Sequence, residues 1–149
     1  MQSVPGEYEY LPHTADAKFR AYGETLEGAF RNAARAMTAL LTDLSKVKPA
    51  REIQISLTAK NQDSLLFDFL DQLLFLLDTE AFLLHECKDV KITKTMKNGT
   101  DAYELSCTVT GDDYQNSETR GDVKAITYND MLVEQLPDKR WVCQVVVDL

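Results

Sequence analysis

Two short segments near the start of the chain alternate apolar with polar side chains. Tyr8 and Tyr10 alternate with glutamates, and Phe19 and Ala21 alternate with basic residues. A period of two places every second side chain on the same face of a strand. The pattern therefore predicts two half-buried strands, separated by a break at Pro12.

Two longer segments carry apolar residues at the spacing of an amphipathic helix. The first spans residues 26–41 and follows Thr25, a good N-cap residue. The second spans residues 65–77, and either Asn61 or Asp63 is suited to cap it. We expect the apolar stripe of the first helix to face the core, because a sheet is available to cover it, and the second helix to be largely buried.

The remaining patterned segments indicate further strands. They are residues 53–58, a short strand or extended segment at 82–84, and residues 90–96, 103–110, 123–134 and 140–148. Asn98-Gly99 is a strong hairpin signal, because a type I′ turn needs positive φ at both central residues. Pro137-Asp138 is expected to join the last two strands. The final strand is apolar on both faces, which predicts a place inside the sheet.

These elements define an α+β fold. Residues 111–121 are polar and lack periodicity, so we expect an exposed, mobile loop there. The prediction is a single domain over residues 1–149, a two-layer sandwich in which two helices pack on one face of a mostly antiparallel sheet. A chain of 149 residues with 44% hydrophobic composition is large enough to bury a sizeable core.

The charge balance excludes several partners. Formal net charge is −8, and no run of lysine or arginine exceeds two residues, so a phosphate backbone would be repelled. We therefore expect no direct binding to nucleic acid. The most apolar stretch, residues 65–84, is interrupted by charged side chains that a bilayer would not accept, so we expect no membrane contact.

Cysteine usage points to a reducing compartment. Cys87, Cys107 and Cys143 are odd in number and widely spaced, and they form no CxxC motif. Neither a disulfide framework nor a zinc site is indicated, and no signal peptide is recognisable. We expect the protein to reside in the cytoplasm.

Candidate chemistry begins in the connection between the first two strands. His13 and Asp16 lie in a short loop that can hold an imidazole and a carboxylate in place. The alternative is an ordinary turn, in which Asp16 only bonds a nearby backbone N–H. No P-loop, GxGxxG, GxSxG or HExxH motif is present, so the common nucleotide-binding and hydrolase signatures are absent.

The C-terminal end offers carboxylates. Asp148 and the terminal carboxylate of Leu149 are adjacent, and Asp16 would add a third anionic group if the two ends met. Oxygen ligands suit a hard divalent cation such as Ca²⁺, Mg²⁺ or Mn²⁺. The alternative is an exposed terminal aspartate that binds nothing.

Several stretches together resemble the archease family over nearly the whole chain. They are Glu9-Tyr10-Leu11-Pro12-His13-Thr14-Ala15-Asp16, Leu26-Glu27-Gly28-Ala29-Phe30, Leu65-Leu66-Phe67-Asp68-Phe69-Leu70-Asp71, Val123-Lys124-Ala125-Ile126-Thr127-Tyr128 and Val147-Asp148-Leu149. The resemblance implies a non-enzymatic activator of the GTP- and manganese-dependent tRNA-splicing RNA ligase. Such an activator promotes guanylylation of the ligase and lets it turn over repeatedly.

The resemblance also assigns roles to single residues. It implies that a divalent metal is held by Asp16, Asp148 and Leu149, and that Lys124 is functionally important. His13 belongs to the same motif as Asp16 and is a further candidate for partner contact. The alternative for Lys124 is a solvated charge on the wet face of a strand. One departure is Asn129, which stands where many family members have histidine.

Two other functions stay open at this level. A chaperone or adaptor without a metal role would keep full activity when the carboxylates are removed. A small metal-dependent hydrolase would turn over a substrate by itself.

The charge of the chain generates a first prediction. The purified protein should show no measurable tRNA binding at physiological salt, because binding needs cationic side chains that displace counterions from phosphate. An electrophoretic mobility-shift titration with tRNA measures this. A clear shift by the protein alone would contradict an activator that acts without contacting RNA.

Overall fold

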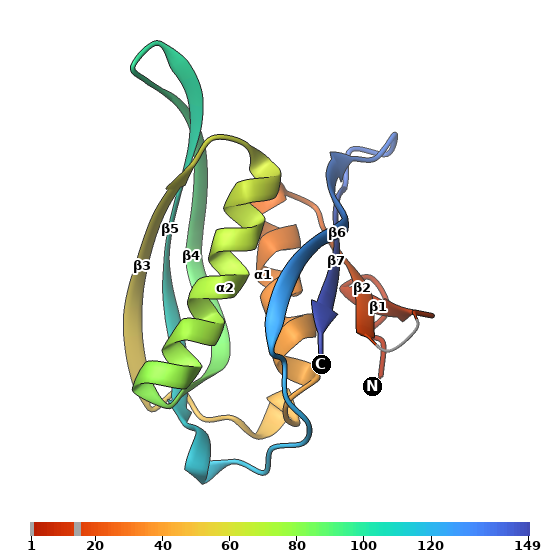
Figure 1. The fold of residues 1–149 in the computed structure, drawn as a ribbon, viewed down its shortest axis with the longest axis vertical. Coiled ribbons are helices and arrows are strands. Elements are labelled where there is room, and N and C mark those ends of the chain that lie inside the picture. Colours follow the sequence, from red (N-terminus) through yellow and green to blue (C-terminus); the bar gives the residue numbers. More distant parts are fainter. Residues whose placement is uncertain (1, 14–15) are drawn as a thin grey trace.

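Two antiparallel sheets enclose two helices (Figure 1). The computed structural model describes residues 2–13 and 16–149. Its elements are β1 (Tyr8–Leu11), β2 (Asp16–Gly23), α1 (Leu26–Ala39), β3 (Arg51–Ala59), α2 (Gln62–Glu80), β4 (Phe82–Lys97), β5 (Thr100–Asp113), β6 (Ala125–Gln135) and β7 (Trp141–Asp148). Short 3₁₀ helices lie at Leu44–Lys46 and Tyr114–Asn116.

The predicted α+β class with antiparallel pairing is confirmed, but the layers differ in number from the expectation. One sheet has the order β1-β2-β7-β6 and the other β3-β5-β4. Both helices contact strands of both sheets, so the helices form a middle layer instead of covering one face of a single sheet. Helical periodicity shows which residues are apolar, but not how many sheets cover them.

Both helices begin at the predicted caps. The Thr25 hydroxyl accepts a hydrogen bond from the Gly28 N–H at 3.0 Å. At the start of α2 the side chain of Asn61 accepts from the Ser64 N–H at 2.8 Å, so Asn61 and not Asp63 is the N-cap. Each cap satisfies a backbone donor that the first turn leaves without a partner.

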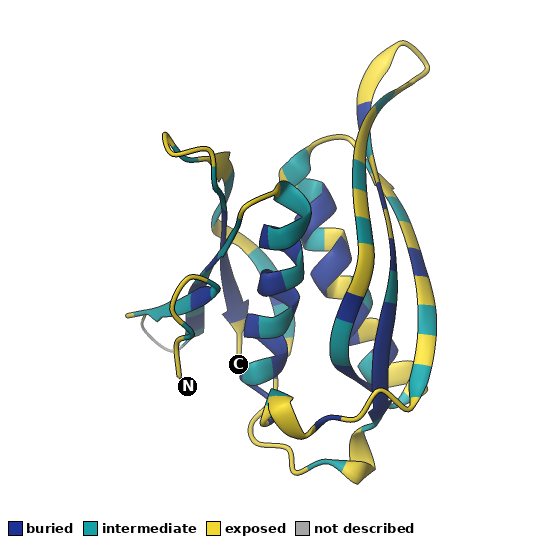
Figure 2. Ribbon diagram, turned by 180° about the vertical axis from the view of Figure 1, so that it is seen from behind, coloured by how far each residue is buried: buried dark blue, intermediate teal, exposed yellow. Residues whose placement is uncertain are grey.

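The β4–β5 hairpin contains the predicted turn. Asn98 and Gly99 both have positive φ, 52° and 80°, as a type I′ turn requires. β4 is one strand from Phe82 to Lys97 with two register shifts, whereas the sequence suggested two separate segments. The hairpin extends beyond the helices, and its outer end is mostly exposed (Figure 2).

The expectation of a loop over residues 111–121 is wrong at its start. Gly111 and Asp112 are buried and, with Asp113, complete β5 opposite the first residues of β4. A Cβ on Gly111 would lie 2.1 Å from the Leu83 carbonyl oxygen, so glycine permits the close pairing. The rest of the segment is tied to the end of α1, since the Arg120 N–H donates to the Leu41 carbonyl at 2.6 Å.

The last strand lies inside its sheet, as its apolar pattern predicted. β7 pairs with β2 on one side and with β6 on the other. Val145 faces the core, and Val146, on the opposite face, is also fully buried. β6 begins at Ala125, two residues later than expected, and a register shift between Thr127 and Leu132 interrupts its pairing with β7.

The three cysteines are free and buried. Burial raises the pKa of the Cys107 thiol to about 11, which keeps it protonated at neutral pH. Within residues 2–13 and 16–149, no helix is long and apolar enough to cross a membrane.

The close approach at Gly111 generates a stability prediction. Gly111→Ala should lower the free energy of unfolding by about 1–3 kcal/mol, because the added methyl group meets backbone that cannot move aside cheaply. Chemical denaturation measures the change. The control is Ser106→Ala, at an exposed position of the same strand, which should change stability by less than about 0.5 kcal/mol. Equal stability of the two variants would contradict the close packing.

Candidate functional site: carboxylates at the ends of β2 and β7

The two aspartates that the sequence singled out meet across the four-stranded sheet. Asp16 is the first residue of β2 and Asp148 is the last residue of β7, and the two are direct partners in the antiparallel register. Directly opposed residues have Cβ atoms about 4.5–5.5 Å apart and point to the same face. The fold therefore brings together carboxylates that are 132 positions apart, the difference between 148 and 16.

Core packing sets this register. Ala17, Phe19 and Ala21 face the core from β2, opposite Val147, Val145 and Cys143 of β7. The alternate residues, beginning with Asp16 and Asp148, then lie on the outer face. A slip of one residue would turn the apolar set outward, so burial of the core also fixes the carboxylate pair.

Few positive charges balance the carboxylates of Asp16 and Asp148. The Asp16 side chain is 27% exposed, and its Oδ2 lies 3.7 Å from Nδ1 of His13. Asp148 is exposed. In the described part of the chain, no lysine or arginine forms an ion pair with either aspartate. Like charges directly opposite one another are unfavourable, so this end of the sheet is a place where a bound cation would relieve repulsion.

A hydrogen-bond network that the sequence did not reveal borders the pair on the same face. The Lys18 ammonium lies 3.4 Å from Oδ2 of Asp130, whose carbonyl accepts from the Gln144 amide at 2.7 Å. The other end of the Gln144 amide accepts from Arg20 at 2.8 Å. Lys18 is thereby held toward the irregular part of β6. The alternation along β2 predicted that Lys18 faces solvent. Only the folded chain shows that its partner is Asp130.

Lys124 and Leu149 also lie at this end of the sheet. The Lys124 N–H donates to the Asp148 carbonyl at 2.8 Å, and the next residue, Ala125, pairs with Asp148. The Lys124 side chain is exposed and forms no hydrogen bond or ion pair with the described residues. The Leu149 side chain is 44% exposed. The structure thus gathers the predicted residues His13, Asp16, Lys124, Asp148 and Leu149, while Thr14 and Ala15 of the same motif lie outside the described residues.

The donor set fits a hard cation only if main-chain oxygen contributes. Among the residues that the structure describes, no three His, Cys, Asp or Glu side chains are placed to hold a metal ion. Asp16 and Asp148 supply two carboxylates, and a carboxylate on Leu149 would be a third anionic oxygen donor beside them. Carboxylates of this kind suit Ca²⁺, Mg²⁺ or Mn²⁺ and not a metal that prefers thiolate ligands.

Comparison with known proteins defines the class of protein. Residues 8–149 match the Archease protein family (MTH1598/TM1083). The chain is 40% identical to the protein archease of Thermococcus gammatolerans over 144 residues, 95% of this chain and 98% of that protein. It is 38% identical to the protein archease of Pyrococcus furiosus over 145 residues, 96% and 99% of the two chains.

A solved structure has the same fold. The solution structure of Methanobacterium thermoautotrophicum protein 1598 superposes with a TM-score of 0.75 at 36% identity, covering 97% of this chain and 99% of that one. The chain belongs to the archease family.

Repulsion across the strand pair is testable in the presence of a chelator. Asp16→Asn and Asp148→Asn should each raise the free energy of unfolding by a few tenths of a kcal/mol, since each removes one of two opposed charges. The double variant should gain no more than the better single one, because the repulsion can be removed only once.

Chemical denaturation of the four proteins, at low and high salt, measures this coupling. The gain should shrink at high salt, which screens exposed charges. The matched control is Glu134→Gln, an exposed carboxylate on β6 opposite the apolar Val142. Additive or destabilising effects of the two aspartate substitutions would show that the carboxylates do not repel one another.

Proposed function

We propose that this protein is a non-enzymatic activator of the GTP- and manganese-dependent tRNA-splicing RNA ligase. It promotes guanylylation of the ligase and its multiple turnover, and it carries a divalent metal ion held by carboxylates. Membership of the archease family supports the assignment. The observation that carries the metal site is the register that sets Asp16 opposite Asp148 at an exposed end of the sheet.

Each residue of the site has a role in this proposal. Asp16, Asp148 and the carboxylate of Leu149 hold the metal ion. His13, whose Nδ1 lies 3.7 Å from Oδ2 of Asp16, borders that carboxylate and contacts the ligase. When bound, the cation supplies positive charge that neutralises phosphate oxygens. The exposed Lys124 extends this positive region by contacting a phosphate group or an acidic side chain of the ligase.

The strand ends suit delivery of these groups to another protein. The site lies at the edge of the molecule, where Asp148 and Lys124 are both exposed, and not at the bottom of an enclosing pocket. A rigid scaffold holds it, because β7 is paired on both sides and buried from Val142 to Val147. An exposed group of side chains on a rigid sheet can enter the nucleotide site of a partner protein without rearranging.

Ligation by a cognate RNA ligase tests the proposal. Adding the protein should convert single-turnover ligation into multiple turnover, and Asp16→Asn or Asp148→Asn should lower this stimulation at least about tenfold by weakening the metal site. Glu134→Gln should stimulate as well as the native protein. Full stimulation by both aspartate variants would favour an adaptor without a metal role. Substrate turnover by the isolated protein would favour a hydrolase.

The carboxylate of Leu149 is tested by extending the chain. A short C-terminal extension leaves every side chain in place but turns this carboxylate into a neutral amide carbonyl. The affinity for Mn²⁺ or Ca²⁺, measured by calorimetry, should fall together with ligase stimulation. An N-terminal extension of the same length should change neither. Native metal affinity and native stimulation in the C-terminally extended form would remove Leu149 from the site.

A further inference from the structure

Lys18 is the one lysine of β2, and it lies beside the carboxylate pair. It follows Asp16 by two residues on the same face of the strand, about 7 Å along the backbone. Its register partner on β7 is Val146, which makes Asp148 its diagonal neighbour. Diagonal neighbours in a sheet are within reach of long side chains. The Lys18 side chain is therefore long enough to reach the carboxylates, but the structure pairs it with Asp130 instead.

Asp130 holds the Lys18 ammonium from an irregular part of β6. Its Oδ2 lies 3.4 Å from the Lys18 nitrogen, and the Lys18 side chain is only 19% exposed. Asp130 belongs to the stretch between Thr127 and Leu132 where the pairing with β7 is shifted. It has a φ of 51°, a left-handed conformation that aspartate and asparagine adopt more readily than most residues. The irregularity of β6 thus presents a carboxylate to the lysine.

The position of Asp130 draws Lys18 away from the carboxylate pair. Along the outer face of β7, Gln144 and Asp148 lie on opposite sides of Val146, the register partner of Lys18. The Asp130 carbonyl accepts from the Gln144 amide at 2.7 Å, so Asp130 lies on the side of Lys18 that is opposite to Asp148. An ammonium held on that side leaves the anionic oxygens of the pair available to a hard cation.

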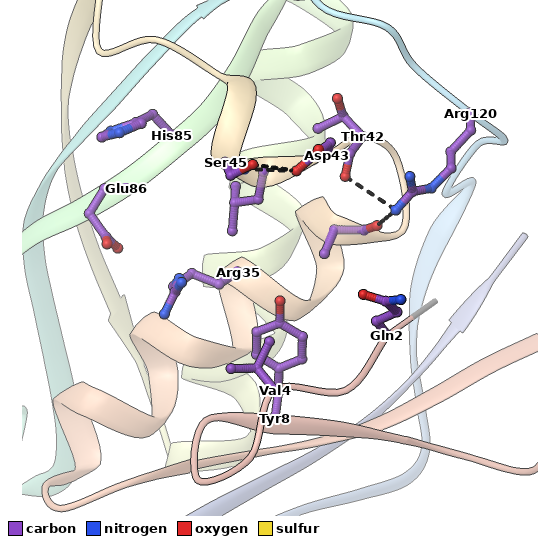
Figure 3. Close-up of a pocket in the computed structure, with 12 residues that line it drawn as sticks. Gln2, Val4, Tyr8, Arg35, Thr42, Asp43, Ser45, His85, Glu86 and Arg120 are labelled. Carbon is purple, nitrogen blue, oxygen red and sulfur yellow. Dashed lines mark hydrogen bonds between the residues drawn. The ribbon is translucent and has the colours of Figure 1, made fainter.

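Cations elsewhere in the molecule are also held by internal acceptors, but at a distance from the carboxylate pair. In a polar cavity of about 730 Å³ at the C-terminal end of α1, Nη2 of Arg120 donates to the carbonyls of Ala39 and Thr42, at 2.7 and 3.4 Å (Figure 3). Neither aspartate of the pair lines this cavity. Lys18 differs from Arg120 because the groups that it reaches without its acceptor are the donors of the proposed metal site.

We propose that Asp130 is a positioning residue for the metal site, because it keeps the Lys18 ammonium from taking the place of the metal ion beside Asp16 and Asp148. This role rests on the proposed function and adds what keeps the metal site free. Without the Asp130 carboxylate, Lys18 pairs with the two opposed carboxylates and relieves their repulsion. A metal ion then has to displace the ammonium, so the metal affinity falls.

Asp130→Asn tests this role with little disturbance of the backbone, because asparagine also tolerates a positive φ and keeps the carbonyl that accepts from Gln144. Calorimetry with Ca²⁺ alone should show binding about twofold to fivefold weaker than that of the native protein, the range for one exposed ion pair. In a Lys18→Met background, Asp130→Asn should not weaken Ca²⁺ binding. Equal weakening in both backgrounds would mean that Asp130 acts only through its own charge, and would overturn the proposal.

The matched control is the ion pair of Lys94 and Asp101, whose charged atoms are 3.5 Å apart on the β4–β5 hairpin. Asp101→Asn removes a carboxylate of similar exposure, 62% against 59% for Asp130, far from the carboxylate pair (Figure 1). It should leave the affinity for Ca²⁺ unchanged. Thermal unfolding verifies that each variant is folded.

NMR of the metal-free protein separates failure of this role from failure of the metal site. The ε-carbon signal of Lys18 should stay in place on Asp148→Asn in the native background. It should move on the same substitution in an Asp130→Asn background, because only there does the ammonium contact the pair. Absence of Ca²⁺ binding by the native protein would overturn the metal site and this role together. Native Ca²⁺ binding with a Lys18 signal that stays in place in both backgrounds would overturn this role alone.

Discussion

The antiparallel pairing of β2 with β7 is the constraint on which the rest of the molecule depends. It joins the second strand to the last, places Phe19 beside Val145 under the helices, and leaves Asp16 opposite Asp148 at the rim. The same hydrogen bonds therefore stabilise the fold and position the two carboxylates. Because β7 is also paired with β6, its last residues are held on both sides, and Lys124 is fixed beside Asp148 through the backbone.

The middle layer of helices joins the two sheets through one hydrophobic core. α1 and α2 are covered on both sides by sheet, and buried side chains from both sheets join one hydrophobic core. The aromatic rings of Phe30 and Phe69 stack between the two helices, with centroids 6.0 Å apart. Exposed polar groups lie on the surfaces of the sheets, on the outer face of α2 and at the ends of the elements, where the carboxylate pair is found.

The two polar regions have opposite character. At the end of β2 and β7, carboxylates oppose one another with few cations nearby, which favours a bound cation. At the end of α1 the positive charges are engaged within the fold, because Arg35 pairs with Glu7 and Arg120 donates to the carbonyls of Ala39 and Thr42. An overall net charge of −8 does not reveal this difference. Local pairing of charges, and not the total, decides what each region can hold.

The sequence by itself determined the local elements. The cap at Thr25, the turn at Asn98-Gly99 and the interior place of the last strand were predicted, because each depends on neighbouring residues or on periodicity along one segment. Only the tertiary structure decided how segments combine. The periodicity of apolar residues does not indicate how many sheets cover a helix. It also does not show that Gly111 completes a strand. Nor does spacing along the chain give the register that places Asp16 opposite Asp148, or the packing that leaves Nε of Arg35 without a hydrogen-bond partner among the described residues. Both arise from contacts between distant segments.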